Sequence, residues 1–171
     1  MQRNKVLVPL SHDHFHGLML AQILKKNAPP LKGMPKDIDE KVRYAVEFYN
    51  SDLTEHFKSE EEILFPAAKG MDITLDAMLQ ELINEHRAIK EGISALASAK
   101  DLPEEMDKLG RLLEGHIRKE ERVVFPRIEL LLTEDKLKQL DGKFNPVRKN
   151  ESDTGKGKKK KGSREDESTA E

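Results

Sequence analysis

Two copies of one short motif stand sixty positions apart in this chain, and each carries a histidine followed by two glutamates. They occupy residues 56–66 and 116–126, and both follow the pattern H-x3-E-E-x-[aliphatic]2-F-P. In an α-helix, residues four positions apart lie on one face, so each copy presents a histidine and a glutamate side by side. The two pairs are His56 with Glu60 and His116 with Glu120.

Two such pairs that face each other from different helices make a cluster of four nitrogen and oxygen ligands. Imidazole and carboxylate together suit iron, manganese or zinc. One histidine taken alone would be read as an ordinary polar residue on a charged helix. A carboxylate that is buried without a partner costs several kcal/mol, however, and a metal ion is the simplest partner for two of them. The repeat therefore predicts a metal site.

A second, weaker repeat adds a histidine to each half of the chain. The matching triplets are Leu10, His14 and Leu24, and Leu82, His86 and Leu96. In both triplets an acidic residue directly precedes the histidine. The chain thus reads as two helical hairpins, each with a histidine on its first helix and His-x3-Glu on its second. All six histidines of the chain fall within these motif regions.

The spacing of apolar residues predicts helices throughout and no strands, because it follows the helical period and never alternates. A proline and a glycine, Pro66 and Gly70, come late in and just after the second helix. Pro66 is expected to kink this helix or to begin a separate last turn. The expected fold class is all-α, an antiparallel up-down four-helix bundle with a short fifth helix. The expected helices cover about 11–26 (with Ser11 as N-cap), 37–69, 74–99, 103–131 and 134–140.

Composition divides the chain into a folded part and a tail. From about Asn145 apolar residues become rare, and residues 155–163 form a run of lysine and glycine. Such a segment cannot bury enough apolar surface to fold. We therefore expect a helical domain over residues 1–142 and a disordered, Lys-rich tail over residues 143–171.

Composition also limits the function classes. The chain has no cysteine, which excludes disulfides, thiolate zinc sites and iron–sulfur ligation. No apolar run approaches the ~18 residues of a membrane span, and Pro9 interrupts the opening segment too early for a signal peptide. Before residue 143 there are 21 basic and 26 acidic residues, which argues against a dedicated nucleic-acid surface. We expect a cytoplasmic protein with no membrane segment and no specific nucleic-acid partner.

From about Leu10 to Leu131 the chain resembles the hemerythrin-like (HHE cation-binding) family. Ferritin-like di-iron bundles place the glutamate first, as Glu-x2-His, whereas this chain has the order His-x3-Glu. The motifs that carry the resemblance are Asp13-His14, His56-x3-Glu60-Glu61-x3-Phe65-Pro66, Glu85-His86 and His116-x3-Glu120-Glu121-x3-Phe125-Pro126.

The resemblance implies a non-haem di-iron site with two Fe per chain inside an antiparallel bundle. Glu60 and Glu120 would bridge the two irons, which need shared anions to offset their repulsion. The terminal imidazole ligands would be His14, His56, His86 and His116.

The chain departs from oxygen-carrying members of the family on the third helix. Those members have a second histidine four residues from the first, where this chain has Leu82 and Lys90. A further imidazole is therefore expected from the first helix. His16 is expected to reach the second iron, and His12 with His16 forms an alternative pair four residues apart. The expected order of importance is His14, then His16, then His12.

The resemblance implies a protein that binds or responds to dioxygen, nitric oxide or iron, with a small gas ligand at an open iron position. An alternative is an enzyme, a di-iron oxidase or peroxidase or an NO-handling protein, or an iron–sulfur repair protein. No separate acid–base residue is evident, so no catalytic residue is predicted. A third interpretation makes the metal site structural and the Lys-rich tail the working part.

Overall fold

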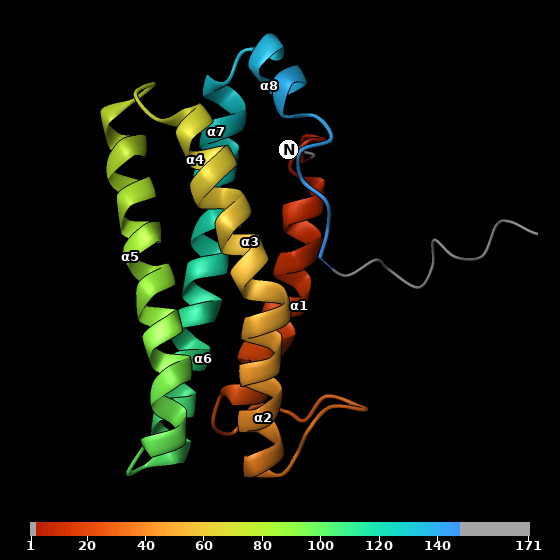
Figure 1. The fold of residues 1–171 in the computed structure, drawn as a ribbon, viewed down its shortest axis with the longest axis vertical. Coiled ribbons are helices and arrows are strands. Elements are labelled where there is room, and N and C mark those ends of the chain that lie inside the picture. The colour runs from red at the N-terminus through yellow and green to blue at the C-terminus, as the bar shows by residue number, and fades with distance from the viewer. Residues whose placement is uncertain (1–2, 148–171) are drawn as a thin grey trace, which may run out of the picture.

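The computed structural model describes residues 3–147, and all the regular elements within this range are helices, as expected for the all-α class. The elements join into long helical rods that lie side by side (Figure 1). The first rod is α1 (Val8–Leu24). After the fourth and last rod comes one short helix, α8 (Glu134–Leu140). The second rod is α2 (Ile38–Phe48), η1 (Tyr49–Leu53), α3 (Thr54–Ser59), η2 (Glu60–Leu64) and α4 (Phe65–Ala68). The third is α5 (Ile73–Ala95) with η3 (Leu96–Ser98), and the fourth is α6 (Leu102–Lys119), η4 (Glu120–Val124) and α7 (Phe125–Leu131).

Side-chain caps begin four of the described helices, among them α5, where Asp72 accepts from the backbone N–H of Leu75 at 2.8 Å. Asp37 accepts from the backbone of Asp39 and Glu40 at the start of α2. Thr133 accepts from the backbone of Lys136 at the start of α8, whose bounds agree with the predicted helix over 134–140. Asp101 begins α6 by accepting from the backbone of Glu104. Each cap satisfies a backbone N–H that the first helical turn leaves without a partner.

The predicted start of the first helix was wrong. Helix α1 begins at Val8, three residues before the expected N-cap Ser11, and carries Pro9 in its first turn. Proline suits this position because the first N–H groups of a helix have no partner within it. The Ser11 hydroxyl donates instead to Oε1 of Glu121, at 2.7 Å.

Both copies of the repeated motif contain a π-helical turn. The turns begin at Glu60 and Glu120, and each is closed by the following phenylalanine, whose N–H bonds to the carbonyl five residues back. Pro66 and Pro126 come next. A proline cannot donate to the helix, and its ring would crowd the carbonyl four residues earlier, so a widened turn accommodates it. Pro66 was expected to kink the helix or to begin a separate last turn. The structure has this π-turn before it and a short last helix, α4, with Pro66 in its first turn.

Two apolar clusters fill the interior, one on either side of a layer of buried histidines and glutamates. Leu82 belongs to the first cluster and Ile89 to the second, and His86 lies between them on α5. The other rods show the same sequence of layers. The metal-ligand candidates therefore sit midway along the rods with apolar side chains above and below, which limits the access of water.

Helix α1 packs along α6 without room for extra atoms. A Cβ atom at Gly110 would lie 2.8 Å from the backbone oxygen of Ala21, and one at Gly17 would lie 2.7 Å from Cδ1 of Ile117. Glycine at these positions lets the two helices approach closely. This packing brings His14 on α1 to the fourth rod.

The segment after α8 returns to the helical domain. Phe144 is only 4% exposed and joins the first apolar cluster, and the Val147 N–H donates to Oδ1 of Asp13 at 2.9 Å. Phe144 and Val147 thus contact the helical rods, although both belong to the segment predicted as tail. The rest of the predicted tail lies outside the described residues.

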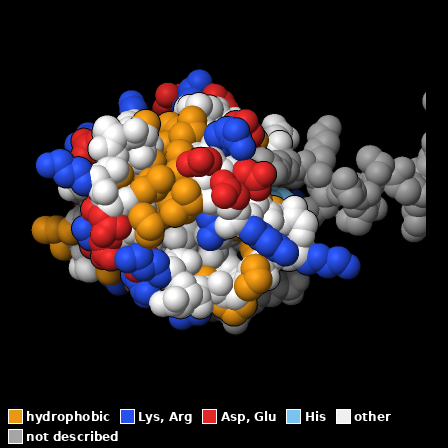
Figure 2. All heavy atoms as spheres, turned by 90° about the horizontal axis from the view of Figure 1, so that it is seen from below, with side chains coloured by type: hydrophobic (Ala, Val, Ile, Leu, Met, Phe, Trp, Pro, Cys, Tyr) orange, Lys and Arg blue, Asp and Glu red, His pale blue; other side chains and the backbone are white. Residues whose placement is uncertain are grey.

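Both charged and large apolar side chains reach the surface, among them Phe15, Ile73 and Leu130. Seen from the end of the molecule where α2 begins, apolar side chains gather in a band bordered by acidic and basic ones (Figure 2). Within the described range, none of the helices has the length and apolar character needed to cross a membrane.

Candidate metal centre

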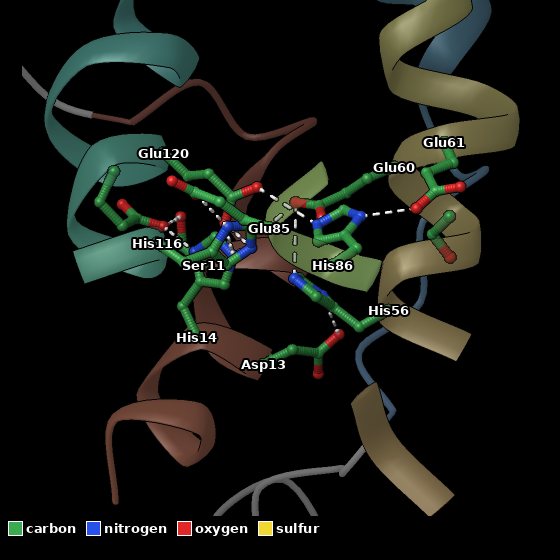
Figure 3. A network of polar contacts seen from close by, with 12 residues as sticks. Ser11, Asp13, His14, His56, Glu60, Glu61, Glu85, His86, His116 and Glu120 are labelled. Atoms are coloured by element: carbon green, nitrogen blue, oxygen red, sulfur yellow. Dashed lines mark hydrogen bonds and ion pairs between the residues drawn. The ribbon is translucent and has the colours of Figure 1, made fainter. Parts of the chain in front are cut away.

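Four rods place six ligand candidates in one buried layer (Figure 3). Helix α1 supplies one histidine, the second and fourth rods each supply a His-x3-Glu pair, and α5 supplies the fourth histidine. None of the six is more than 3% exposed. They are His14, His56, Glu60, His86, His116 and Glu120.

The six residues form two overlapping groups of four. Within each group the ligand atoms lie within 4.8 Å of one another. One group contains His14 and His56, the other contains His86 and His116, and both contain the two glutamates. The residues thus provide two neighbouring sets of two nitrogens and two carboxylates, with the carboxylates shared.

The oxygens of Glu60 face both groups. Oε1 lies 3.4 Å from Nε2 of His56 and 3.7 Å from Nε2 of His14, whereas Oε2 lies 3.4 Å from Nε2 of His86. Glu120 contacts both groups as well: its Oε2 lies 3.0 Å from Nε2 of His14 and 3.3 Å from Nε2 of His116. Each carboxylate is therefore placed to bridge two cations.

The inward-facing atoms of this layer lack hydrogen-bond partners. The unpaired atoms include Nε2 of all four histidines and both carboxylate oxygens of Glu60 and Glu120. Buried polar groups in proteins are almost always paired, because leaving one unpaired costs about 1–3 kcal/mol. Eight such atoms aimed at one point fit a site that is built to coordinate cations, so the donor set is the right one for a metal.

An outer ring of carboxylates holds the imidazoles from behind. Nδ1 lies 2.6 Å from Glu121 for His14, 2.7 Å from Glu61 for His86 and 2.9 Å from Glu85 for His116. Asp13 approaches Nδ1 of His56 at 3.4 Å. A carboxylate at Nδ1 fixes the ring orientation and keeps the proton on that nitrogen, which leaves the Nε2 lone pair for a metal.

Aromatic rings form the walls of the layer. Phe57 stacks on His86 with ring centroids 3.9 Å apart, and Phe125 stacks on His14 at 5.3 Å. Phe65, the counterpart of Phe125 in the repeat, lies 6.1 Å from His86. The stacking limits rotation of the two imidazoles and excludes water from their faces.

The electrostatics of the layer favour positive charge. Burial lowers the pKa of the His14 imidazole, but the carboxylates of Glu120, Glu121 and Glu60 outweigh burial and raise this pKa well above its usual value. Burial raises the pKa of Glu60, but the surrounding histidines outweigh it and hold this pKa well below its usual value. Burial likewise opposes ionisation of Glu121, and His14, Ser11 and Arg3 lower its pKa to about 2. Glu60 and Glu121 therefore stay ionised and attract cations.

Six of the seven predicted ligands lie together, and His16 does not. His16 is half-buried and lies outside both four-residue groups, and His12 is exposed. His14 and His16 are two residues apart on a helix, so their side chains point in different directions. On α5, Leu82 is buried in the first apolar cluster, and Lys90 lies beside a surface pocket.

The outer carboxylates were only partly foreseen. Glu61 and Glu121 stood in the sequence only as the second acid of each motif, and in the structure each has an imidazole partner. Asp13 and Glu85 were noticed only as the acids that precede His14 and His86. The repeat itself could have identified them, because residues at equivalent positions of the two copies make equivalent contacts. Tyr49 lines a surface pocket whose lining also includes Glu61 and His86.

Comparison with known proteins agrees with this geometry. No curated protein and no solved structure matches the chain significantly. The family model of the hemerythrin HHE cation binding domain matches residues 10–129, a range that includes all six buried ligand candidates. The chain therefore belongs to the hemerythrin HHE cation-binding domain family.

Proposed function

We propose that this protein is a di-iron protein that binds or responds to dioxygen or nitric oxide. The observation that carries the proposal is the pair of four-residue groups that share Glu60 and Glu120. A single ion would need only one of these groups. Two ions held side by side need shared anions to offset their repulsion, and two buried carboxylates placed between four imidazoles supply them.

The donor set supports iron and leaves coordination positions free. Each ion would receive two imidazole nitrogens and two carboxylate oxygens, a mixture typical of di-iron carboxylate proteins built in helix bundles. We take the rods to form an antiparallel up-down four-helix bundle around this pair. When bound, the iron pair would supply redox chemistry and open positions for a small gas ligand.

The protein's own residues would hold the ions and control their surroundings. The outer carboxylates orient the imidazoles, and the apolar clusters on either side keep bulk water out.

Spectroscopy on iron-loaded protein tests the proposal. The protein is reconstituted with ferrous iron without oxygen, and absorption spectra are recorded before and after addition of nitric oxide or dioxygen. The proposal predicts new visible bands with each gas, and their loss when Glu60→Ala removes the shared carboxylate. Unchanged spectra with both gases would contradict it. Continuous turnover of peroxide or nitric oxide would favour the enzyme instead.

A further inference from the structure

The two ends of the buried layer are related by the internal repeat but are not alike. His14 with Glu121 at one end corresponds to His86 with Glu61 at the other, and the two Nδ1 contacts differ by only 0.1 Å. The surroundings of the two glutamates differ, and this difference shows which end is accessible.

The His14 end is covered by the segment that precedes α1. Arg3 donates to Oε2 of Glu121 at 2.7 Å and to its backbone oxygen at 2.8 Å, and it lies over the ring of Phe125. Ser11 and His14 contact the other carboxylate oxygen. Both oxygens of Glu121 are thus paired, and a cation of the chain itself, Arg3, supplies the countercharge.

The His86 end opens instead into a pocket of about 270 Å³. Glu61 and His86 belong to its lining, and Tyr49 and Phe57 provide its apolar and aromatic wall. Glu61 has a side-chain exposure of 39%, against 28% for Glu121, and among residues 3–147 its side chain bonds to His86 alone.

Three cations surround the pocket: Lys58, Arg87 and Lys90. Within residues 3–147, Lys58 and Lys90 form no ion pair, and Arg87 contacts only the amide oxygen of Asn84, at 3.5 Å. The pocket also contains Glu62, so three positive charges face two negative ones, and one of the negative ones, Glu61, is already engaged by His86. Elsewhere most cations near the layer are paired, as Arg3 and Lys119 are.

The positions that match these cations at the other end lack this arrangement. In the repeat, Lys58 corresponds to Arg118, which pairs with Glu114 on its own helix. Arg87 and Lys90 correspond by the second repeat to Phe15 and Leu18. The excess of unpaired positive charge is therefore a feature of one end only.

We propose that this pocket binds a small monovalent anion beside the His86–Glu61 pair and is the anion-selective end of the metal centre. Lys58, Arg87 and Lys90 attract the anion, and the wall formed by Tyr49 and Phe57 limits its size. The link between this pocket and the metal centre rests on the proposed function. Unpaired cations around a concave, partly apolar wall focus the field and concentrate anions there. The Arg3 contact leaves no equivalent positive charge free at the His14 end.

Quenching of tyrosine fluorescence tests the anion site without any iron. The chain has two tyrosines and no tryptophan, so Tyr44→Phe leaves Tyr49 in the pocket as the one fluorophore. Iodide serves as the small anionic quencher and acrylamide as the neutral one. In this background the double variant Lys58→Glu/Lys90→Glu should lower the iodide quenching constant at least about twofold. Acrylamide quenching should stay the same, and added salt should weaken iodide quenching only when the lysines are present.

Arg118→Glu is the matched control, because it makes the same charge change at the equivalent position of the other end. It should leave iodide quenching of Tyr49 unchanged. Equal iodide quenching in the double variant and in Arg118→Glu would overturn the proposal, and so would a parallel fall with acrylamide, which would indicate altered access rather than charge. Circular dichroism on each variant verifies folding. Because no iron is used, failure here would leave the di-iron proposal standing.

Discussion

Glu121 lies 2.6 Å from Nδ1 of His14, although the two residues are 107 positions apart. The contact joins the first helical rod to the fourth and fixes the direction of the imidazole. The repeat supplies the same contact between Glu61 and His86, at 2.7 Å. The second acid of each H-x3-E-E motif therefore orients a histidine of another rod, while the first acid faces the centre of the layer.

The two acids of the motif should thus differ in their effect on metal binding. Glu60→Gln and Glu120→Gln remove a charge from between the ions and should prevent retention of a full metal complement. Glu61→Gln and Glu121→Gln should weaken binding by about 10–100-fold, as losses behind a ligand do. Iron retained against a chelator gives the ranking. Equal losses from all four variants would show that the assignment of inner and outer carboxylates is wrong.

Among the three histidines of α1, only His14 should matter for metal. Its Nε2 lies 3.0 Å from Glu120 and it is 3% exposed, whereas His12 is exposed and His16 is half-buried. His14→Ala should lose metal, and His12→Ala and His16→Ala should keep it. Metal content after gel filtration compares the three. An empty site in His16→Ala with a filled site in His14→Ala would contradict the structure.

Two glycines of α6 should respond to alanine in opposite directions. Gly115 has open space where a Cβ would lie, so Gly115→Ala should stabilise the protein by up to about 1 kcal/mol through helix propensity. Gly110 faces the backbone oxygen of Ala21 at 2.8 Å, so Gly110→Ala should force α1 and α6 apart and destabilise it. Thermal unfolding of both variants is the measurement. A higher melting temperature for Gly110→Ala would show that α1 and α6 can move apart at this contact without loss of stability.

The Asp72–Arg127 pair should give stability that depends on pH. The main cause of the lowered Asp72 pKa is the hydrogen bond that its carboxylate accepts from the backbone N–H of Leu75. Burial raises this pKa, and Arg127, which donates to the carboxylate at 2.8 Å, lowers it further. A carboxyl whose pKa is lower in the folded state stabilises above its unfolded pKa and loses this effect as pH falls through the folded value. Asparagine still caps a helix, so Asp72→Asn isolates the charge.

At pH 7, Asp72→Asn should therefore melt below the unmodified protein, and the difference should shrink as pH falls below about 4. Asp135→Asn is the control, because Asp135 is 90% exposed and lies 3.9 Å from Lys138. The melting temperature of Asp135→Asn should stay close to that of the unmodified protein at every pH. A difference for Asp72→Asn that stays constant down to acid pH would rule out the ion pair as its cause.

Much of this account could be predicted from the sequence, because a doubled motif carries spacing information twice. The His-x3-Glu spacing was enough to place Glu60 and Glu120 on the same faces as their histidines. His14 was ranked above His16 by the second repeat, and the structure places His14 in the layer. The start of α1 was missed because Ser11 was read as a local cap, whereas its hydroxyl bonds to Glu121 on a distant rod.

Other features depend on contacts between distant segments and could not be predicted from local patterns. The return of Phe144 and Val147 to the helical domain depends on an apolar surface that forms only after the rods pack. The π-turns at Glu60 and Glu120 precede a proline in each motif, but a third π-turn, η1, is followed by Thr54 and not by proline, so local sequence alone does not place them. The role of Arg3 depends on where the chain before α1 happens to lie.

The metal content of protein reconstituted with ferrous iron under anaerobic conditions tests the central claim most directly. After removal of loosely bound metal, we expect two irons per chain, because two four-residue groups share both glutamates. A content of one iron per chain would contradict the di-iron site, and so would a protein that retains zinc but no iron.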